Sequence, residues 1–150
     1  MACDRVKPGE DLDTLITDLF DTMYAAPGRG LAAPQIGVMK RVFVMDVTWK
    51  DGPRSPIAVV NPSIEPVGQD KVAADEACLS IPGVSAQVAR PARIRMRWTA
   101  PDGTANQAEF VGAWATCAQH EADHLDGRVI FDRLGTAERA RLEAAFRAVS

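Results

Sequence analysis

The sequence predicts an α+β fold in which mainly antiparallel sheets pack around a central helix, with a further helix at the C-terminus. Apolar residues recur at helical spacing over residues 12–24 and alternate strictly with arginines over residues 93–99, while no helix breaker interrupts residues 113–125. Turn residues, and not regular helical crossovers, join the strands, which favours antiparallel pairing. We expect a single domain over residues 1–150, because a chain of this length forms one ordinary core.

The N-terminal half of the chain is expected to form one helix and several short strands. Apolar residues from Leu12 to Tyr24 line one face of a helix that ends near Ala26, where Pro27 and the glycines that follow stop it. Residues 31–37 are expected to be irregular or extended. Strands are then predicted from apolar and β-branched runs, at residues 41–47, at residues 57–61, where Pro62 closes the strand, and at residues 64–67.

The C-terminal half is expected to form a hairpin followed by two helices. Residues 93–99 and 107–111 are the predicted hairpin strands, joined by turn residues between them. The central helix covers residues 113–125, and Gly127 is expected to be its glycine cap. Thr136 is the expected N-cap of the last helix, which carries apolar side chains on one face: Leu142, Phe146 and Val149.

The charge balance and the apolar pattern argue against two kinds of partner. Seventeen Lys+Arg against twenty Asp+Glu give a net charge of −3, so we expect no nucleic acid as a primary ligand. No apolar run reaches about 18 residues and no signal peptide is recognisable, so we expect no membrane contact and a cytoplasmic location. We also expect a monomer. The cysteines, Cys3, Cys78 and Cys117, are odd in number, which favours free or metal-bound thiols over disulfides.

The two histidines of the sequence, His120 and His124, lie four residues apart in the predicted central helix, with Glu121 between them. At 100° per residue the imidazoles lie about 40° apart around the helix, and Glu121 lies about 60° to the side of His124. Two imidazoles at this spacing can bind one ion while the carboxylate flanks its open side. Such an HExxH arrangement suits hydrolysis, because the ion lowers the pKa of bound water and the glutamate accepts its proton. The alternative is a surface helix with two solvated histidines.

A third ligand would complete this site, and the residues leave two candidates open. Glu143 lies 19 residues after His124, but glutamates are common on helix surfaces, and Arg147, one turn later, is not the acidic neighbour that such ligands favour. Cys78 lies in an expected loop at residues 76–83, and a thiolate is a strong metal ligand. The other interpretation of Cys78 is a small buried hydrophobic side chain.

Three segments together resemble the three motifs of the peptide deformylase family: GRGLAAPQIG at residues 28–37, EACLS at residues 76–80 and QHEADHLDG at residues 119–127. They occur in the family's order, and the resemblance runs from about residue 12 to residue 134. It implies that Cys78, His120 and His124 hold one divalent ion, with water in the fourth position. Fe(II) is the ion expected from the family, and the same ligand set accepts Zn or Ni.

The resemblance also implies a reaction and the groups that carry it. Glu121 takes the proton from the bound water, which attacks the formyl carbon of an N-formylated peptide, and then protonates the leaving amine as formate is released. The side-chain amide of Gln35 and the backbone N–H of Leu79 stabilise the oxyanion. The expected function is removal of the N-formyl group from the N-terminal formylmethionine of new polypeptides, with a transient ribosome contact as a further expected partner.

Several residues are expected to contact the substrate: Gly28, Arg29, Gly30, Ala77, Ala113, Thr116 and Cys117. Gly28 and Gly30 would let the substrate backbone approach an extended edge of the protein. The sequence departs from the family pattern around the pocket. Ala77 replaces a glycine, and large apolar residues are replaced at Arg29, Ala74, Ala113 and Thr116. These changes predict a wider and more polar pocket than a methionine site.

Two other functions remain open from the sequence. The changed pocket favours a deformylase-like amidohydrolase that acts on a different N-formyl or N-acyl substrate. A catalytically silent metal-binding protein is the third interpretation, which is disfavoured because a purely structural metal site does not require Gln35, Leu79 or Glu121. Because a core of this size needs no metal to fold, we expect an apoprotein that stays folded but inactive.

Overall fold

The computed structural model describes residues 3–78 and 81–127 of the chain, with residues 74–86 described by their backbone alone within those ranges. The helices are α1 (Asp13–Ala25), the short 3-10 helix η1 (Ala33–Ile36) and α2 (Gly112–Leu125). The strands are β1 (Gly30–Ala32), β2 (Val42–Met45), β3 (Ile57–Pro66), β4 (Lys71–Cys78), β5 (Ile81–Pro91), β6 (Arg93–Thr99) and β7 (Ala105–Val111).

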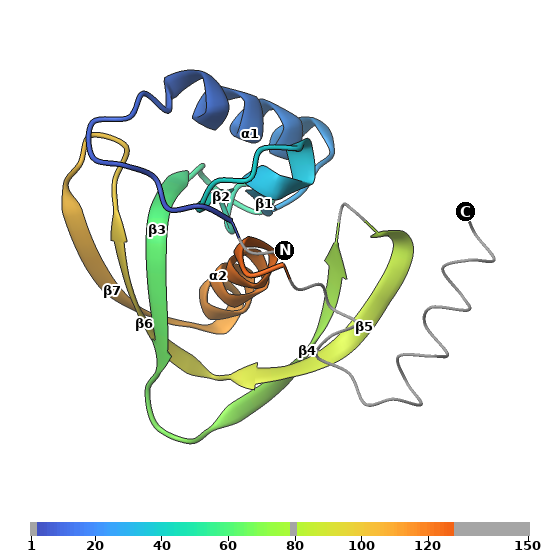
Figure 1. Cartoon of the computed structure of the whole chain (residues 1–150). Helices are drawn as coiled ribbons and strands as arrows, with labels where there is room; N and C mark the ends of the chain where they lie inside the picture. Colours follow the sequence, from blue (N-terminus) through green and yellow to red (C-terminus); the bar gives the residue numbers. More distant parts are fainter. Residues whose placement is uncertain (1–2, 79–80, 128–150) are drawn as a thin grey trace.

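The strands form two antiparallel sheets on either side of α2. One sheet has the strand order β1-β2-β3-β6-β7, and the other consists of β4 and β5. Helix α2 contacts strands of both sheets and lies between them, whereas α1 covers the outer side of β1 and β2 (Figure 1). The predicted α+β class, with antiparallel sheets around the helix that carries HExxH, is confirmed.

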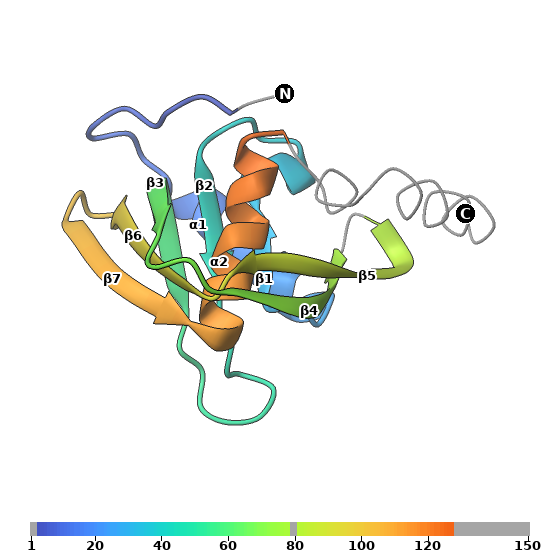
Figure 2. The same cartoon turned by 90° about the horizontal axis from the view of Figure 1, so that it is seen from below.

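Strand β2 is buried on both faces and separates two apolar clusters. Val42 and Val44 point toward α1, while Phe43 and Met45 point toward α2. Successive side chains of a strand point to opposite faces, so a continuous apolar run is what a strand between two helices requires. Figure 2 shows α2 crossing the inner face of this sheet. The core therefore packs against α2 along its buried side.

The two predicted helices within the described residues are confirmed. Helix α1 buries Leu19 and Met23 completely and ends at Ala25, as its apolar spacing predicts. Helix α2 covers the predicted stretch, and Gly127 follows it with a φ of 78° and donates its N–H to the carbonyl of His124 at 3.1 Å. This left-handed glycine closes the helix three residues after the second histidine.

Strand β3 corrects the prediction that Pro62 ends a strand. The strand continues to Pro66 because the register shifts between Val60 and Ser63, and this irregularity accommodates the proline. Asn61 adopts a positive φ of 49° there. Its side-chain amide accepts from the N–H of Val6 and donates to the carbonyl of Val6, both at 2.9 Å. Asn61 thus joins the irregular point of β3 to the N-terminal segment.

The β4–β5 hairpin is absent from the sequence-based expectation, and the prediction that Cys78 lies in a loop is wrong. Cys78 is the last residue of β4, and its backbone pairs with Ile81 of β5. Residues 71–78 lack the alternation of large apolar side chains that marks a half-buried strand. Residues 31–37, expected as irregular or extended, form the end of β1 followed by η1. The helix predicted from Thr136 lies outside the described residues.

Within the described part of the chain, no helix combines the length and the apolar character that a membrane span requires.

Candidate active site

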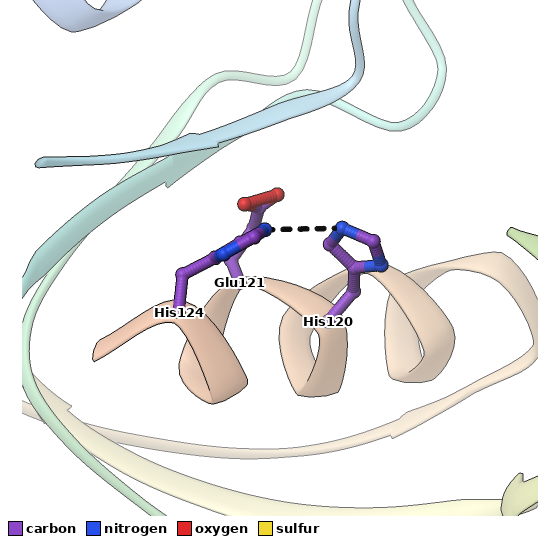
Figure 3. A group of neighbouring side chains, drawn as sticks. All are labelled: His120, Glu121 and His124. Carbon is purple, nitrogen blue, oxygen red and sulfur yellow. Dashed lines mark hydrogen bonds between the residues drawn. The ribbon is translucent and has the colours of Figure 1, made fainter. Parts of the chain in front are cut away.

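Helix α2 brings His120, Glu121 and His124 to one buried side. Their exposed fractions are 8%, 4% and 7%. Figure 3 shows the three side chains rising from the same side of the helix, with the two imidazoles turned toward each other. The structure contradicts the alternative of a surface helix with solvated histidines, because neither imidazole is exposed.

The histidine pair has a separation that suits a shared ion. The Nε2 atoms of His120 and His124 lie 3.3 Å apart, and the rings are inclined by 67°. Two nitrogens about 2.0–2.1 Å from one tetrahedral ion lie about 3.3–3.4 Å apart, so the observed distance fits such an ion. The ligand atoms of both histidines and Glu121 lie within 4.8 Å of one another. The donor set and its spacing therefore fit one divalent metal ion.

Gly30 of β1 packs directly against this group. A β-carbon placed on Gly30 would lie 2.8 Å from Oε2 of Glu121 and 2.8 Å from Sγ of Cys117. Real β-carbons do not approach other atoms so closely, so a side chain at this position would displace one of these neighbours. The sequence predicted Gly30 as a point of close substrate approach, and the structure adds a packing reason for the glycine.

Gln35 is oriented by the backbone of β1. Its Oε1 accepts a hydrogen bond from the N–H of Ala32 at 2.9 Å, in the pattern of a side chain that caps the start of η1. Since a backbone N–H can only donate, this bond assigns the oxygen of the amide to the Ala32 side. The NH₂ group of Gln35 therefore points away from Ala32 as a hydrogen-bond donor.

Among the strands that the structure describes, β1 lies at the edge of its sheet, with β2 as its neighbour. The carbonyl of Arg29, just before β1, accepts from the N–H of Asp46 at 2.9 Å on the β2 side. Because successive residues of a strand direct their backbone groups to opposite sides, the N–H and carbonyl of Gly30 face the open edge. An extended peptide could pair with that edge beside Glu121.

The other expected substrate contacts lie at different places in the structure. Ala113 is exposed and Thr116 and Cys117 are half-buried, all on α2 before His120. The Cys117 thiol donates to the carbonyl of Arg29 at 3.6 Å. The Arg29 guanidinium forms an exposed ion pair with Asp51 at 3.3 Å, in the loop after β2.

Several predicted site residues lie outside the side chains that the structure describes. The side chains of Ala74, Ala77 and Cys78 belong to the stretch described by its backbone alone. Leu79 and Glu143 lie outside the described residues. Their roles remain predictions.

A buried ion pair beside the histidines has no counterpart in the sequence-based expectation. Nη1 of Arg90 donates to Oδ2 of Asp123 at 2.8 Å, and the two side chains are only 5% and 7% exposed. Gln119 adds a hydrogen bond from Nε2 to the carbonyl of Pro91 at 3.1 Å. Both contacts join α2 to β5, the partner strand of β4. The sequence holds one signal for them, since Arg90 is the one charged residue in the stretch 77–92.

The antiparallel fold around a helix with two facing imidazoles and a buried glutamate defines a metal-dependent hydrolase of the HExxH type. The model of the polypeptide deformylase family matches residues 1–140, and the chain belongs to this family. The resemblance drawn from the three motifs is thereby confirmed.

Individual relatives and solved structures agree with this assignment. Peptide deformylase of Zymomonas mobilis is 42% identical over 137 residues, which cover 89% of this chain and 77% of the relative. Peptide deformylase 1 of Corynebacterium glutamicum is 46% identical over 141 residues, which cover 93% of this chain and 82% of the relative. The crystal structure of peptide deformylase from Thermus thermophilus matches with a TM-score of 0.87 at 37% identity, covering 97% of this chain and 85% of that chain.

Proposed function

We propose that this chain removes the N-formyl group from the N-terminal formylmethionine of newly made polypeptides and releases formate. The observation that carries the proposal is the buried group of His120, Glu121 and His124 on α2, in a chain that belongs to the polypeptide deformylase family. Hydrolysis of the formamide adds water across its C–N bond, so that formate and a free amine leave.

The family is metal-dependent, and we propose His120, His124 and the thiolate of Cys78 as the ligands of one divalent ion. The 3.3 Å separation of the two imidazole nitrogens supports the histidine part of this set. The position of Cys78 at the end of β4, in the EACLS motif, supports the thiolate. When bound, the ion supplies Lewis acidity, which lowers the pKa of water and polarises the formyl carbonyl. Fe(II) is the ion we expect, with Zn or Ni as functional substitutes.

Glu121 is the proposed proton carrier. Its carboxylate lies beside the facing imidazoles and is 4% exposed, so it is largely shielded from bulk water. It accepts the proton of the attacking water and later donates it to the nitrogen of the leaving amine. One residue in this role balances the reaction, because the proton removed from water ends on the amine.

Gln35 and Leu79 are the proposed donors to the oxyanion. The bond from Ala32 to the Gln35 oxygen leaves the NH₂ end of the amide as the end directed away from β1. The backbone N–H of Leu79 would supply a second donor from the residue after Cys78. Donors fixed in place before the reaction stabilise developing negative charge without reorganisation.

The substrate peptide is proposed to align along the open edge of β1. The backbone groups of Gly30 face that edge, and Gly30 lies against Glu121. Pairing there would place the formylated end of an extended peptide next to the carboxylate. Ala113 and Thr116 on α2 are small side chains at the positions where the family has large ones, so we propose a roomy, partly polar side-chain pocket.

The test measures the free amine that hydrolysis exposes, together with the formate or acetate released, with protein prepared without oxygen to protect thiolate and Fe(II) from oxidation. A panel of peptides with N-formyl-Met, N-formyl-Ala and N-acetyl-Met ends separates the candidate functions. We expect formate from the N-formyl-Met peptide at the highest kcat/KM. Preferential hydrolysis of another acyl peptide would favour the amidohydrolase alternative. Metal-loaded protein that hydrolyses none of the peptides would contradict the proposal.

Four further features remain predictions of the same proposal. We propose a single domain over residues 1–150, supported by the family match over residues 1–140. A monomeric state is proposed separately, while a cytoplasmic location and a transient contact with the ribosome follow from the proposed substrate, which emerges on the ribosome. Sedimentation of the purified chain tests the monomeric state. Co-sedimentation with ribosomes tests the ribosome contact.

A further inference from the structure

The loop between β2 and β3, residues 46–56, packs on the turn that leads into β1. The indole Nε1 of Trp49 donates to the carbonyl of Gly28 at 2.9 Å. The backbone N–H of Asp46 donates to the carbonyl of Arg29, also at 2.9 Å. Two successive carbonyls just before Gly30 are therefore held by this loop.

A buried carboxylate fixes the loop in this position. Asp46 is completely buried and accepts from the hydroxyl of Tyr24 at 2.6 Å and from the N–H of Ser55 at 3.1 Å. The Tyr24 ring meets the Trp49 ring edge to face at 5.1 Å, and the Arg54 guanidinium lies over it at 4.1 Å. The loop, α1 and the turn before β1 thus form one hydrogen-bonded unit.

This unit holds the turn that leads into Gly30, a residue that is closely packed against its neighbours. Gly30 lies so close to Glu121 that no β-carbon fits between them, while its N–H and carbonyl face the open edge of β1. A small rotation of the peptide groups at Gly28 and Arg29 would turn those edge groups away from an aligned peptide. By contrast, His120, Glu121 and His124 are held by α2 and its contacts with both sheets.

We propose that Trp49 and Tyr24 are positioning residues for the substrate, which act through the carbonyl of Gly28 and the carboxylate of Asp46. They hold the turn before β1 so that the Gly30 edge can pair with the backbone of an extended N-formyl peptide. This inference rests on the proposed function and adds to it the residues that set peptide alignment. The alignment along the Gly30 edge favours a formylated peptide of at least two residues over a single formylated amino acid.

The decisive variant is Trp49→Phe, which removes the indole N–H and keeps an aromatic ring against Tyr24. Loss of one hydrogen bond of typical strength predicts a roughly fivefold rise in KM for an N-formyl-Met tripeptide, with kcat unchanged within about twofold. KM for N-formyl-methionine, which has no further peptide to align, should change little. Tyr24→Phe, like Trp49→Phe, should raise KM for the tripeptide and leave KM for N-formyl-methionine little changed.

Trp98→Phe is the matched control, because Trp98 on β6 packs against Phe110 on β7, at the end of the sheet opposite to β1. It should leave both KM values unchanged, and melting temperature and metal content should show that all three variants are folded and loaded. Equal changes of KM for the tripeptide and for N-formyl-methionine, or an unchanged tripeptide KM in Trp49→Phe, would overturn the inference. Wild-type protein that releases formate from neither compound would instead overturn the proposed function, and the inference with it.

Discussion

Gly30 and Glu121 are in such close contact that a β-carbon on the glycine would lie 2.8 Å from a carboxylate oxygen and 2.9 Å from Cγ of the glutamate. The contact joins β1, the edge strand proposed to align the substrate, to the residue proposed to move the proton. Substrate alignment and proton transfer therefore both depend on the close packing of Gly30 against Glu121.

Gly30→Ala should reduce kcat while the metal content stays at the wild-type level. The added methyl must displace Glu121 or β1, and a shift of about 1 Å at a reacting group can lower the rate about 100-fold. Gly52→Ala is the matched control, since a β-carbon there would meet its nearest atom, the Thr48 carbonyl oxygen, at an ordinary 3.8 Å. Steady-state formate release checks both variants, and equal kcat values for them would refute the packing argument.

Asp123→Ala should lower the free energy of unfolding by about 3 kcal/mol, because it removes the carboxylate that Arg90 contacts in the interior. The comparison variant is Glu65→Ala, which removes an exposed partner of Arg95 and should change stability by less than about 1 kcal/mol. Urea unfolding of both variants measures the difference. If Asp123→Ala is as mild as Glu65→Ala, the buried pair does not hold β5 to α2.

The ionisation of Tyr24 offers a test by pH. Burial, followed by the hydrogen bond to Asp46 and the charge of that carboxylate, raises the pKa of Tyr24 to about 12 from 10.0. The folded chain then retains a proton that the unfolded chain releases, so this stabilisation is complete below pH 10 and is lost as the pH rises toward 12. Tyr24→Phe should remove that part of the pH dependence.

Because the sequence contains one tyrosine, tyrosinate absorbance reports Tyr24 directly. A titration midpoint near 12 in the folded protein is expected. A midpoint near 10, with the chain still folded, would mean that the hydroxyl is not held by Asp46 as described.

The histidine part of the site could be predicted from sequence because its geometry is local. Four residues of helix suffice to place His120 and His124 on one side, and the helix itself follows from the absence of breakers and the glycine after it. The same is true of α1, whose apolar spacing specifies both its length and its buried face.

The contacts that support the site depend on pairing between distant segments and could not be predicted. Arg90 and Asp123 meet only because β5 packs on α2, and the sequence of β5, which includes two prolines and a glycine, carries little strand signal of its own. Pro62 indicated a strand end by local rules, but the irregularity at Asn61 absorbs it. The sequence predicted that Gly30 allows a close approach by the substrate. Its contact with Glu121 could not be predicted, because Glu121 lies 91 positions later in the sequence.

The thiolate ligand can be tested by metal analysis of cysteine variants. Cys78→Ala should lose most of its bound metal, because it removes the proposed charged ligand and leaves two imidazoles. Cys117→Ala is the control from the same site, since Cys117 contacts the Arg29 carbonyl and is not a proposed ligand. Wild-type metal content in Cys78→Ala would remove the thiolate from the site.

The most direct test of the central claim compares wild-type protein with Glu121→Ala at equal metal loading, using formate release from an N-formyl-Met peptide. Loss of a positioned proton carrier typically lowers the rate about 100- to 10,000-fold. We predict that the wild type releases formate and that Glu121→Ala retains its metal and loses turnover by at least about 100-fold. Turnover by Glu121→Ala at the wild-type rate, or a metal-loaded wild type that releases no formate, would contradict the account.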